Sequence, residues 1–221
     1  MASLTVENYL KTIYQLCGRN DAATASTGAL AEALKVSPGT VTSMLKTLSE
    51  SGLATYTPYE GARLTPPGVK LALRVLRRHR LVELFLVTTL NMTWDEVHDE
   101  AEHLEHAVSE LLVDRIDAFV GRPPPDPHGD PLPRADGSVD EPATRSLAEC
   151  VVGEKFRFVR VLDQSADFLR YLTESDLTIG RSGEVTSNRP ASGAMTVRVG
   201  NKTTTLGLAA AQKILVAAPT A

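Results

Sequence analysis

Six side chains of the kinds that ligate divalent cations recur between residues 79 and 106. They are His79, Glu83, His98, Glu102, Glu105 and His106. Residues three, four, seven or eight apart share one face of a helix, so the last four would form one stripe and the first two would lie one turn apart on the preceding helix. Two such stripes on neighbouring helices could converge on a cation. Imidazole and carboxylate without thiolate favour Mn²⁺ and Fe²⁺, although Co²⁺, Ni²⁺ and Zn²⁺ would also bind.

The chain ahead of these residues has the pattern of three helices and a hairpin. Apolar residues recur at helical spacing over residues 4–17, 28–36 and 38–51. Thr27 is the expected cap of the second helix, and Ser37 followed by Pro38 opens the third. The short break between these two helices is typical of a helix-turn-helix. Because residues 53–68 predict a β-hairpin directly afterwards, the segment is expected to be a winged helix that binds DNA.

Two longer amphipathic helices are predicted next, over residues 69–90 and 94–120, and they carry the six candidate ligands. The apolar stripe of the second helix contains Val97, Leu104, Val108 and Leu111. Two helices seldom form a domain alone. We therefore expect their apolar faces to meet a second copy of the chain in a homodimer.

The net charge of −4 is unevenly distributed. Residues 1–90 contain ten Lys and Arg against six Asp and Glu, residues 91–149 contain four against fifteen, and residues 150–221 contain nine against six. A basic module joined to a carboxylate-rich one suits binding of DNA and of a cation. No segment resembles a signal peptide or a membrane span, and Cys17 and Cys150 form no disulfide framework or zinc motif, so a cytoplasmic location without a membrane is expected.

The remainder of the chain predicts a linker and a small β domain. Residues 121–145 contain seven of the thirteen prolines, which is typical of a linker. Short β-rich runs separated by Gly, Asn and Ser follow at Lys155–Val161, Gly183–Thr186, Met195–Val199 and Thr203–Leu206. With a short helix at Ala166–Thr173, they predict a five- or six-stranded barrel.

Three functions of different classes are compatible with these patterns. The first is a metal-dependent DNA-binding regulator, and the second is a winged-helix regulator whose acidic helix is merely solvated. The third is a metal-dependent enzyme, because His79 and Glu83 beside the later cluster could hold a catalytic ion. The chain contains no nucleophile motif, phosphate-binding loop or cofactor fingerprint, so a function without catalysis is favoured.

Along its whole length the sequence resembles the diphtheria toxin repressor family of metal-dependent transcription regulators. The motifs that carry the resemblance are NYLKTIYQL, VSPGTVTSMLKTL, RRHRLVELFL, VHDEAEHLEH and PHGDPLP. The resemblance implies an α+β chain with a winged-helix domain at 1–66, a helical dimerisation and metal-binding domain at 67–120, a proline-rich linker at 121–148 and an SH3-like domain at 149–221. The last resembles the small domain of ferrous-iron transport accessory proteins.

Two metal sites per subunit are implied by the resemblance. An ancillary site falls on His79, Glu83 and His98, and the primary, activating site falls on Asn8, Glu102, Glu105 and His106. Glu102 stands where iron-responsive members have cysteine, so Mn²⁺ is the expected activator and Fe²⁺ the alternative. Asn8 and Lys11 depart from the manganese-type ligands Asp and Glu, so the binuclear variant is not expected. Two polar ligands from the barrel would be Asp163 and Gln164, for which a turn before the short helix is the alternative.

The resemblance also implies that metal sets the spacing of two recognition helices on a palindromic operator. The polar and helix-opening residues available for DNA contact are Ser37, Pro38, Thr40, Thr42, Ser43 and Lys46. The hydroxyl groups could reach base edges or phosphates, and Lys46 a phosphate. The expected protein is a homodimeric repressor.

Overall fold

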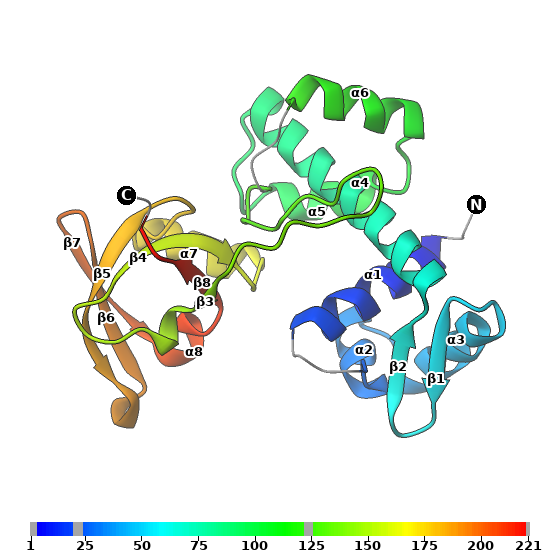
Figure 1. Cartoon of the computed structure of the whole chain (residues 1–221), viewed down its shortest axis with the longest axis horizontal. Coiled ribbons are helices and arrows are strands. Elements are labelled where there is room, and N and C mark those ends of the chain that lie inside the picture. Colours follow the sequence, from blue (N-terminus) through cyan, green and yellow to red (C-terminus); the bar gives the residue numbers. More distant parts are fainter. Residues whose placement is uncertain (1–3, 20–23, 122–125, 220–221) are drawn as a thin grey trace. The chain divides into compact units, whose positions relative to one another are not determined.

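The computed structural model describes residues 4–19, 24–121 and 126–219. By its internal contacts the chain divides into two compact units. The first contains residues 1–79, 105–108 and 133–138, and the second contains residues 80–104, 109–132 and 139–221. Figure 1 shows the elements of each unit. Part of the predicted linker, residues 122–125, lies outside the described residues.

Three helices open the first unit: α1 (Leu4–Arg19), α2 (Thr27–Leu34) and α3 (Pro38–Glu50). Ser37 caps α3 as predicted, because its side chain accepts a hydrogen bond from the Thr40 amide at 3.1 Å. The cap of α2 is Ser26 and not the predicted Thr27: the Ser26 hydroxyl accepts from Ala29 N at 3.1 Å, and Thr27 is already helical.

The predicted hairpin consists of β1 (Ala54–Thr57) and β2 (Gly61–Leu64), paired antiparallel with Ala54 opposite Leu64. Gly61 has φ +104°, and a Cβ there would lie 2.5 Å from the carbonyl oxygen of Ala25, so the turn requires glycine. The largest fully buried core side chains of this winged helix are Leu10, Ile13, Leu30, Leu45 and Leu48. A hairpin following the helix-turn-helix confirms the predicted winged-helix fold.

Helix α4 (Pro66–Leu90) agrees with the predicted helix, but the predicted continuous helix 94–120 is wrong. The structure has α5 (Val97–Leu104) and α6 (Glu110–Val120), separated by a turn. Ser109 begins α6 by accepting a hydrogen bond from Leu112 N at 3.2 Å. The break matters because Glu105 and His106 lie in the turn and not on the stripe assumed from a single helix. No helix within the described ranges is long and apolar enough to cross a membrane.

Large apolar side chains of α6 and of the ends of α4 and α5 are exposed in the single chain, namely Leu90, Leu104, Leu111, Leu112 and Phe119. Val97, which was expected on this face, is fully buried and belongs to the interior. Phe119 packs edge-on against Phe85, with ring centroids 5.9 Å apart. The exposed apolar face fits the expectation that the helices meet a second subunit.

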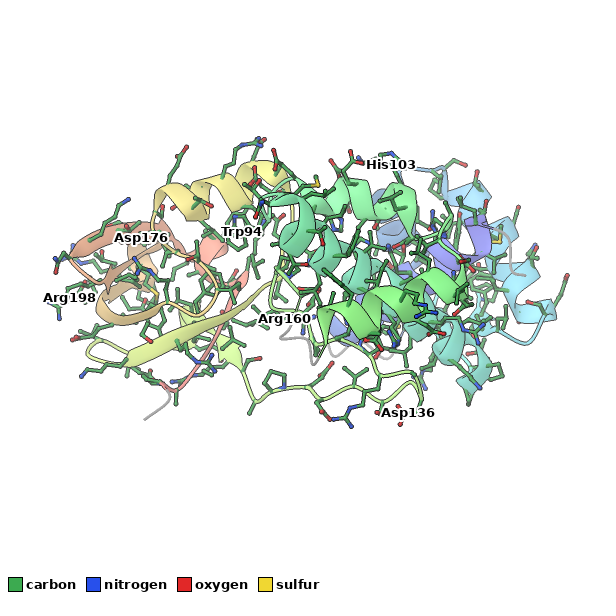
Figure 2. The ribbon with its side chains drawn as sticks, turned by 90° about the horizontal axis from the view of Figure 1, so that it is seen from above. Trp94, His103, Asp136, Arg160, Asp176 and Arg198 are labelled. Carbon is green, nitrogen blue, oxygen red and sulfur yellow. The ribbon has the colours of Figure 1, made fainter. Side chains whose placement is uncertain are left out.

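The C-terminal part is an antiparallel sheet of strand order β3-β8-β4-β5-β6-β7. Its strands are β3 (Arg145–Ser146), β4 (Lys155–Val161), β5 (Ser182–Arg189), β6 (Ala194–Val199), β7 (Lys202–Gly207) and β8 (Ile214–Ala217). The helices are η1 (Leu147–Glu149), α7 (Ala166–Glu174), η2 (Pro190–Ser192) and α8 (Leu208–Ala211). Phe156 and Phe158 are the largest side chains in the core, and Trp94 packs against it (Figure 2). Sequence analysis missed β3 and β8.

Candidate metal centre

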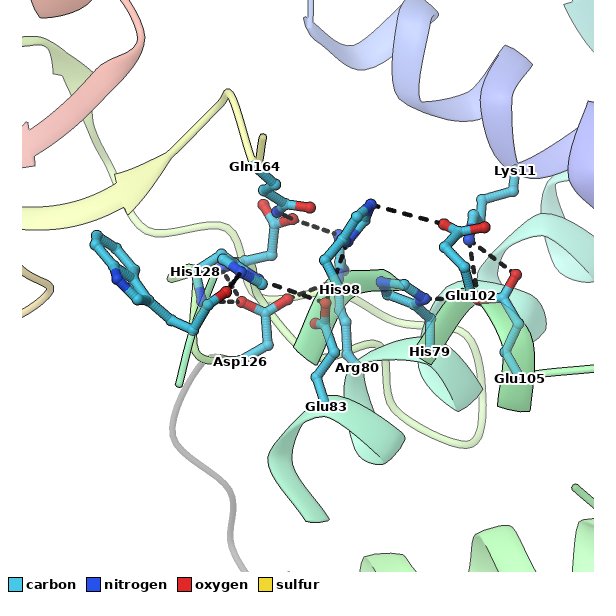
Figure 3. Close-up of polar contacts among 12 residues, drawn as sticks. Lys11, His79, Arg80, Glu83, His98, Glu102, Glu105, Asp126, His128 and Gln164 are labelled. Carbon is cyan, nitrogen blue, oxygen red and sulfur yellow. Dashed lines mark hydrogen bonds and ion pairs between the residues drawn. The ribbon is translucent and has the colours of Figure 1, made fainter. Parts of the chain in front are cut away.

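The carboxylate of Glu105 is fully buried and is surrounded by nitrogen atoms. Lys11, from α1, places Nζ 2.8 and 2.9 Å from its two oxygens. His79 Nδ1, from α4, lies 2.7 Å from Oε2 (Figure 3). Burial raises the pKa of Glu105, but the hydrogen bonds and charges of His79 and Lys11 outweigh it and leave the pKa below its ordinary value. The pocket therefore holds a carboxylate ion against a positive charge.

His106, beside Glu105 in the turn, brings together three of the four predicted primary ligands. Its Nε2 lies 2.7 Å from Asn8 Oδ1 and 3.1 Å from Glu105 Oε1. Its Nδ1 lies 2.8 Å from Glu7 Oε2. An amide oxygen and a carboxylate oxygen thus both lie next to one imidazole nitrogen, while Glu7 contacts the other nitrogen of the ring.

A second cluster, in the other unit, contains Glu83, His98 and Glu102. Glu83 is fully buried on α4, and its Oε1 lies 3.3 Å from His98 Nδ1. His98 Nε2 lies 3.8 Å from Glu102 Oε1, one turn further along α5. Glu83 and His98 were both predicted for the ancillary site. Glu102, which was predicted for the primary site, also approaches His98.

Further residues of the second cluster come from the proline-rich segment. Asp126 and His128 are buried, and their ligand atoms and that of Glu83 lie within 4.8 Å of one another (Figure 3). Arg80 Nη2 lies 3.4 Å from Asp130 Oδ2, and Arg80 Nε lies 3.4 Å from Asp126 Oδ2. The sequence does not predict these residues as ligands, because a proline-rich segment is typical of a linker.

The two barrel candidates have partners of their own. Asp163 Oδ2 is 2.7 Å from Lys213 Nζ, and Oδ1 accepts a hydrogen bond from Ser165 N at 3.0 Å, which is the turn considered as the alternative. Gln164 Nε2 donates to Asp130 Oδ2 at 3.1 Å. Gln164 therefore borders the second cluster through Asp130.

The chemistry of both clusters fits a divalent cation. Carboxylate, amide and imidazole donors are present, and no cysteine contributes: Cys17 lies against the Ala62 carbonyl and Cys150 is buried in the barrel core. The Lys11 ammonium contacts both oxygens of Glu105, so a positive charge already lies beside this carboxylate. Oxygen and nitrogen donors of this kind are those that Mn²⁺ and Fe²⁺ accept in proteins.

The predicted DNA-contact residues lie on and before α3. Ser37, Pro38, Thr40, Ser43 and Lys46 are exposed, and Thr42 is half-buried. Ser43 donates to Gly39 O at 3.1 Å and Thr42 to Pro38 O at 3.0 Å, so their hydroxyl oxygens remain acceptors. These residues provide the ammonium group of Lys46 and several short polar groups.

Family comparisons agree with these features. The iron dependent repressor, N-terminal DNA binding domain matches residues 1–62, and the iron dependent repressor, metal binding and dimerisation domain matches residues 65–134. The FeoA domain matches residues 145–218. The chain belongs to the iron-dependent repressor family, whose members are metal-dependent, DNA-binding transcriptional repressors with a dimerisation domain.

Individual relatives cover from a little over half to nearly all of the chain. A manganese-dependent transcriptional repressor solved in complex with manganese is 39% identical, covers 97% of this chain and 100% of its own, and superposes with a TM-score of 0.88. The diphtheria toxin repressor of Corynebacterium diphtheriae is 30% identical over 82% of this chain and 84% of its own length. The iron-dependent repressor IdeR of Mycobacterium leprae is 35% identical over 58% of this chain and 55% of its own length.

Proposed function

We propose that the chain is a manganese-activated repressor that binds a palindromic operator as a homodimer. The observation that carries the proposal is the approach of Asn8 Oδ1 and Glu105 Oε1 to His106 Nε2, at 2.7 and 3.1 Å. This donor set is hard and contains no thiolate, which suits Mn²⁺. The similarity to a repressor solved with manganese supports the same metal.

Two cations per subunit are part of the proposal. Asn8, Glu102, Glu105 and His106 would hold the activating ion, and His79, Glu83 and His98 the ancillary one. The 3.3 Å approach of Glu83 to His98 and the one-turn spacing of His79 and Glu83 on α4 support the second group.

The activating ion would supply a positive charge that ties α1 to the turn between α5 and α6. Asn8 is on α1, which packs on α2 within the winged helix, so its side chain connects the DNA-binding fold to the turn. Without the ion, the placement of the recognition helix α3 is less restricted. Binding of metal and binding of DNA are then linked, each favouring the other.

Iron is the second candidate for the activating metal. It is favoured by the similarity to an iron-dependent repressor, and by a donor set that also accepts Fe²⁺. An anaerobic titration of operator binding with Mn²⁺ and with Fe²⁺ separates the two. We expect Mn²⁺ to activate binding at micromolar or higher concentration. Activation by Fe²⁺ but not by Mn²⁺ would overturn the assignment, and binding independent of metal would overturn the regulator mechanism.

A further inference from the structure

Both nitrogens of the His106 ring lie against oxygen atoms of α1. Nδ1 lies 2.8 Å from Glu7 Oε2, and Nε2 lies 2.7 Å from Asn8 Oδ1. Glu7 and Asn8 are consecutive residues of α1, whereas His106 belongs to the turn between α5 and α6. The imidazole is therefore held between two neighbouring side chains of one helix.

The two nitrogens of this ring have different surroundings. Nε2 faces Asn8 and Glu105, which are the other proposed ligands of the activating ion, so Nε2 is the atom that would bind the metal. The ring separates these ligands from the Glu7 carboxylate, which lies at Nδ1. An ionised carboxylate only accepts hydrogen bonds, so Nδ1 carries a hydrogen and donates it to Glu7. In the neutral ring, this arrangement leaves the lone pair of Nε2 for a cation.

The Glu7 carboxylate is itself oriented. Arg78, on α4, places Nη1 3.6 Å from Oε1 of Glu7, while Oε2 contacts His106. The side chains of Glu7 and His106 are 15% and 9% exposed, so water and salt screen their contact less than they screen a surface pair. Glu7 also lies in the first turn of α1, where the helix dipole stabilises a negative charge. A negative charge is thus held at Nδ1 of the ring.

We propose that Glu7 is a positioning residue of the activating metal site, which orients the His106 ring and keeps its hydrogen on Nδ1. A histidine that binds a metal usually donates its other N–H to a carboxylate, a carbonyl or water, and this partner fixes the ring and makes the ligating nitrogen more basic. The proposal rests on the function proposed above and adds to it a residue that does not touch the metal. Its consequence is that two adjacent side chains tie α1 to the site, Asn8 as a ligand and Glu7 through His106.

The position of the hydrogen on His106 can be measured in the metal-free protein. Imidazole ¹⁵N spectra distinguish the two tautomers at a pH where the ring is neutral, and the signal is assigned by its loss in H106Q. We expect the hydrogen on Nδ1 in the wild type. In E7A the acceptors at Nε2 remain, so the hydrogen should move to Nε2. A wild-type ring with its hydrogen on Nε2 would overturn the proposal, and so would the same tautomer in wild type and E7A.

Calorimetric titration with Mn²⁺ measures the effect of Glu7 on the metal site. The background variant H98A removes a ligand of the ancillary site, so that the activating site dominates the titration. In that background E7A should weaken Mn²⁺ binding by about tenfold or more, and E7Q, which keeps an oxygen acceptor but loses the charge, should weaken it less. The matched control is E32A, because Glu32 is an exposed glutamate on α2 of the same winged helix. Equal affinity in E7A and E32A would overturn the proposal.

Neither measurement uses DNA, and the tautomer of His106 is measured without metal. Failure of metal-activated operator binding in the wild type would therefore be a separate result, which would count against the proposed function alone.

Discussion

Lys11 and Glu105, ninety-four residues apart in the sequence, form a buried ion pair in which one ammonium lies 2.8 and 2.9 Å from both carboxylate oxygens. The same carboxylate is a proposed ligand of the activating cation. An incoming metal and the Lys11 ammonium therefore compete for the same oxygens. We expect this competition to raise the metal concentration needed for activation.

Replacing Lys11 by methionine should strengthen Mn²⁺ binding at the activating site and weaken the metal-free fold. Removing one partner of a buried pair typically costs about 3–5 kcal/mol, because the remaining charge is unpaired. Thermal unfolding in chelator and Mn²⁺ titration measure the two effects. K70M, at an exposed lysine of α4, is the control. Unchanged Mn²⁺ affinity in K11M would contradict the competition.

The activating and ancillary sites should respond differently to mutation. E105Q or H106A should abolish metal-activated operator binding, because each removes a ligand that connects to α1 through Asn8 or Lys11. H98A should reduce it only in part. Mobility shift with excess Mn²⁺ measures the response, with H103A as the control. Equal losses in H98A and H106A would contradict the division of roles.

Glu102→Cys tests the choice of metal. Thiolate favours softer and later ions than carboxylate does. The variant should therefore bind its operator at lower concentrations of Fe²⁺ and Co²⁺ than the wild type needs, and the concentration of Mn²⁺ needed should fall less. Anaerobic fluorescence anisotropy with labelled operator compares the ions. If the order of the metals is the same in both proteins, Glu102 does not select the metal.

The exposed apolar face of α6 should hold the dimer together, and we expect a dimer even without metal. L111D places a charge in a face that must be buried, so light scattering should find a monomer at micromolar concentration. Val151 is the matched control, since its side chain is 66% exposed on the barrel part and that of Leu111 is 67% exposed. A dimeric L111D would indicate that another surface forms the interface.

Lys46 should contact a phosphate and not a base. K46Q should then weaken binding to all operator sequences by a similar factor and lower the slope of log affinity against log salt by about one. Titrations at several salt concentrations measure the slope. A change confined to one operator position would instead indicate base recognition by Lys46.

The winged helix could be predicted because its signals are local. Ser37 and Pro38 open α3 as expected, and the hairpin follows from apolar residues around a glycine turn. The end of α5 after Leu104 could not be predicted, because the sequence on both sides of the break keeps a helical pattern. In the turn, Glu105 contacts Lys11 and His79, and an isolated lysine on an amphipathic helix gives no sign of a distant buried partner.

Only part of the candidate site could be predicted, because only some of its residues lie in a local pattern. Histidine and glutamate at helical spacing identified Glu83, His98, Glu105 and His106, which the structure brings into two polar clusters. His128 and Asp126 lie among prolines and glycines, where no periodicity exists to reveal a buried face. Their position depends on Trp94 and on β4, which are distant in the sequence.

Gly129 separates His128 from Asp130 and has φ +84°, and a Cβ at this position would overlap the carbonyl oxygen of Val159 on β4. Any other side chain would displace the segment from the strand. A genetic screen for strains that have lost repression should therefore recover substitutions at Gly129, although this residue has no side chain to bind metal or DNA. Such alleles would be recessive if the altered chain fails to accumulate, and dominant if it still dimerises with the normal one.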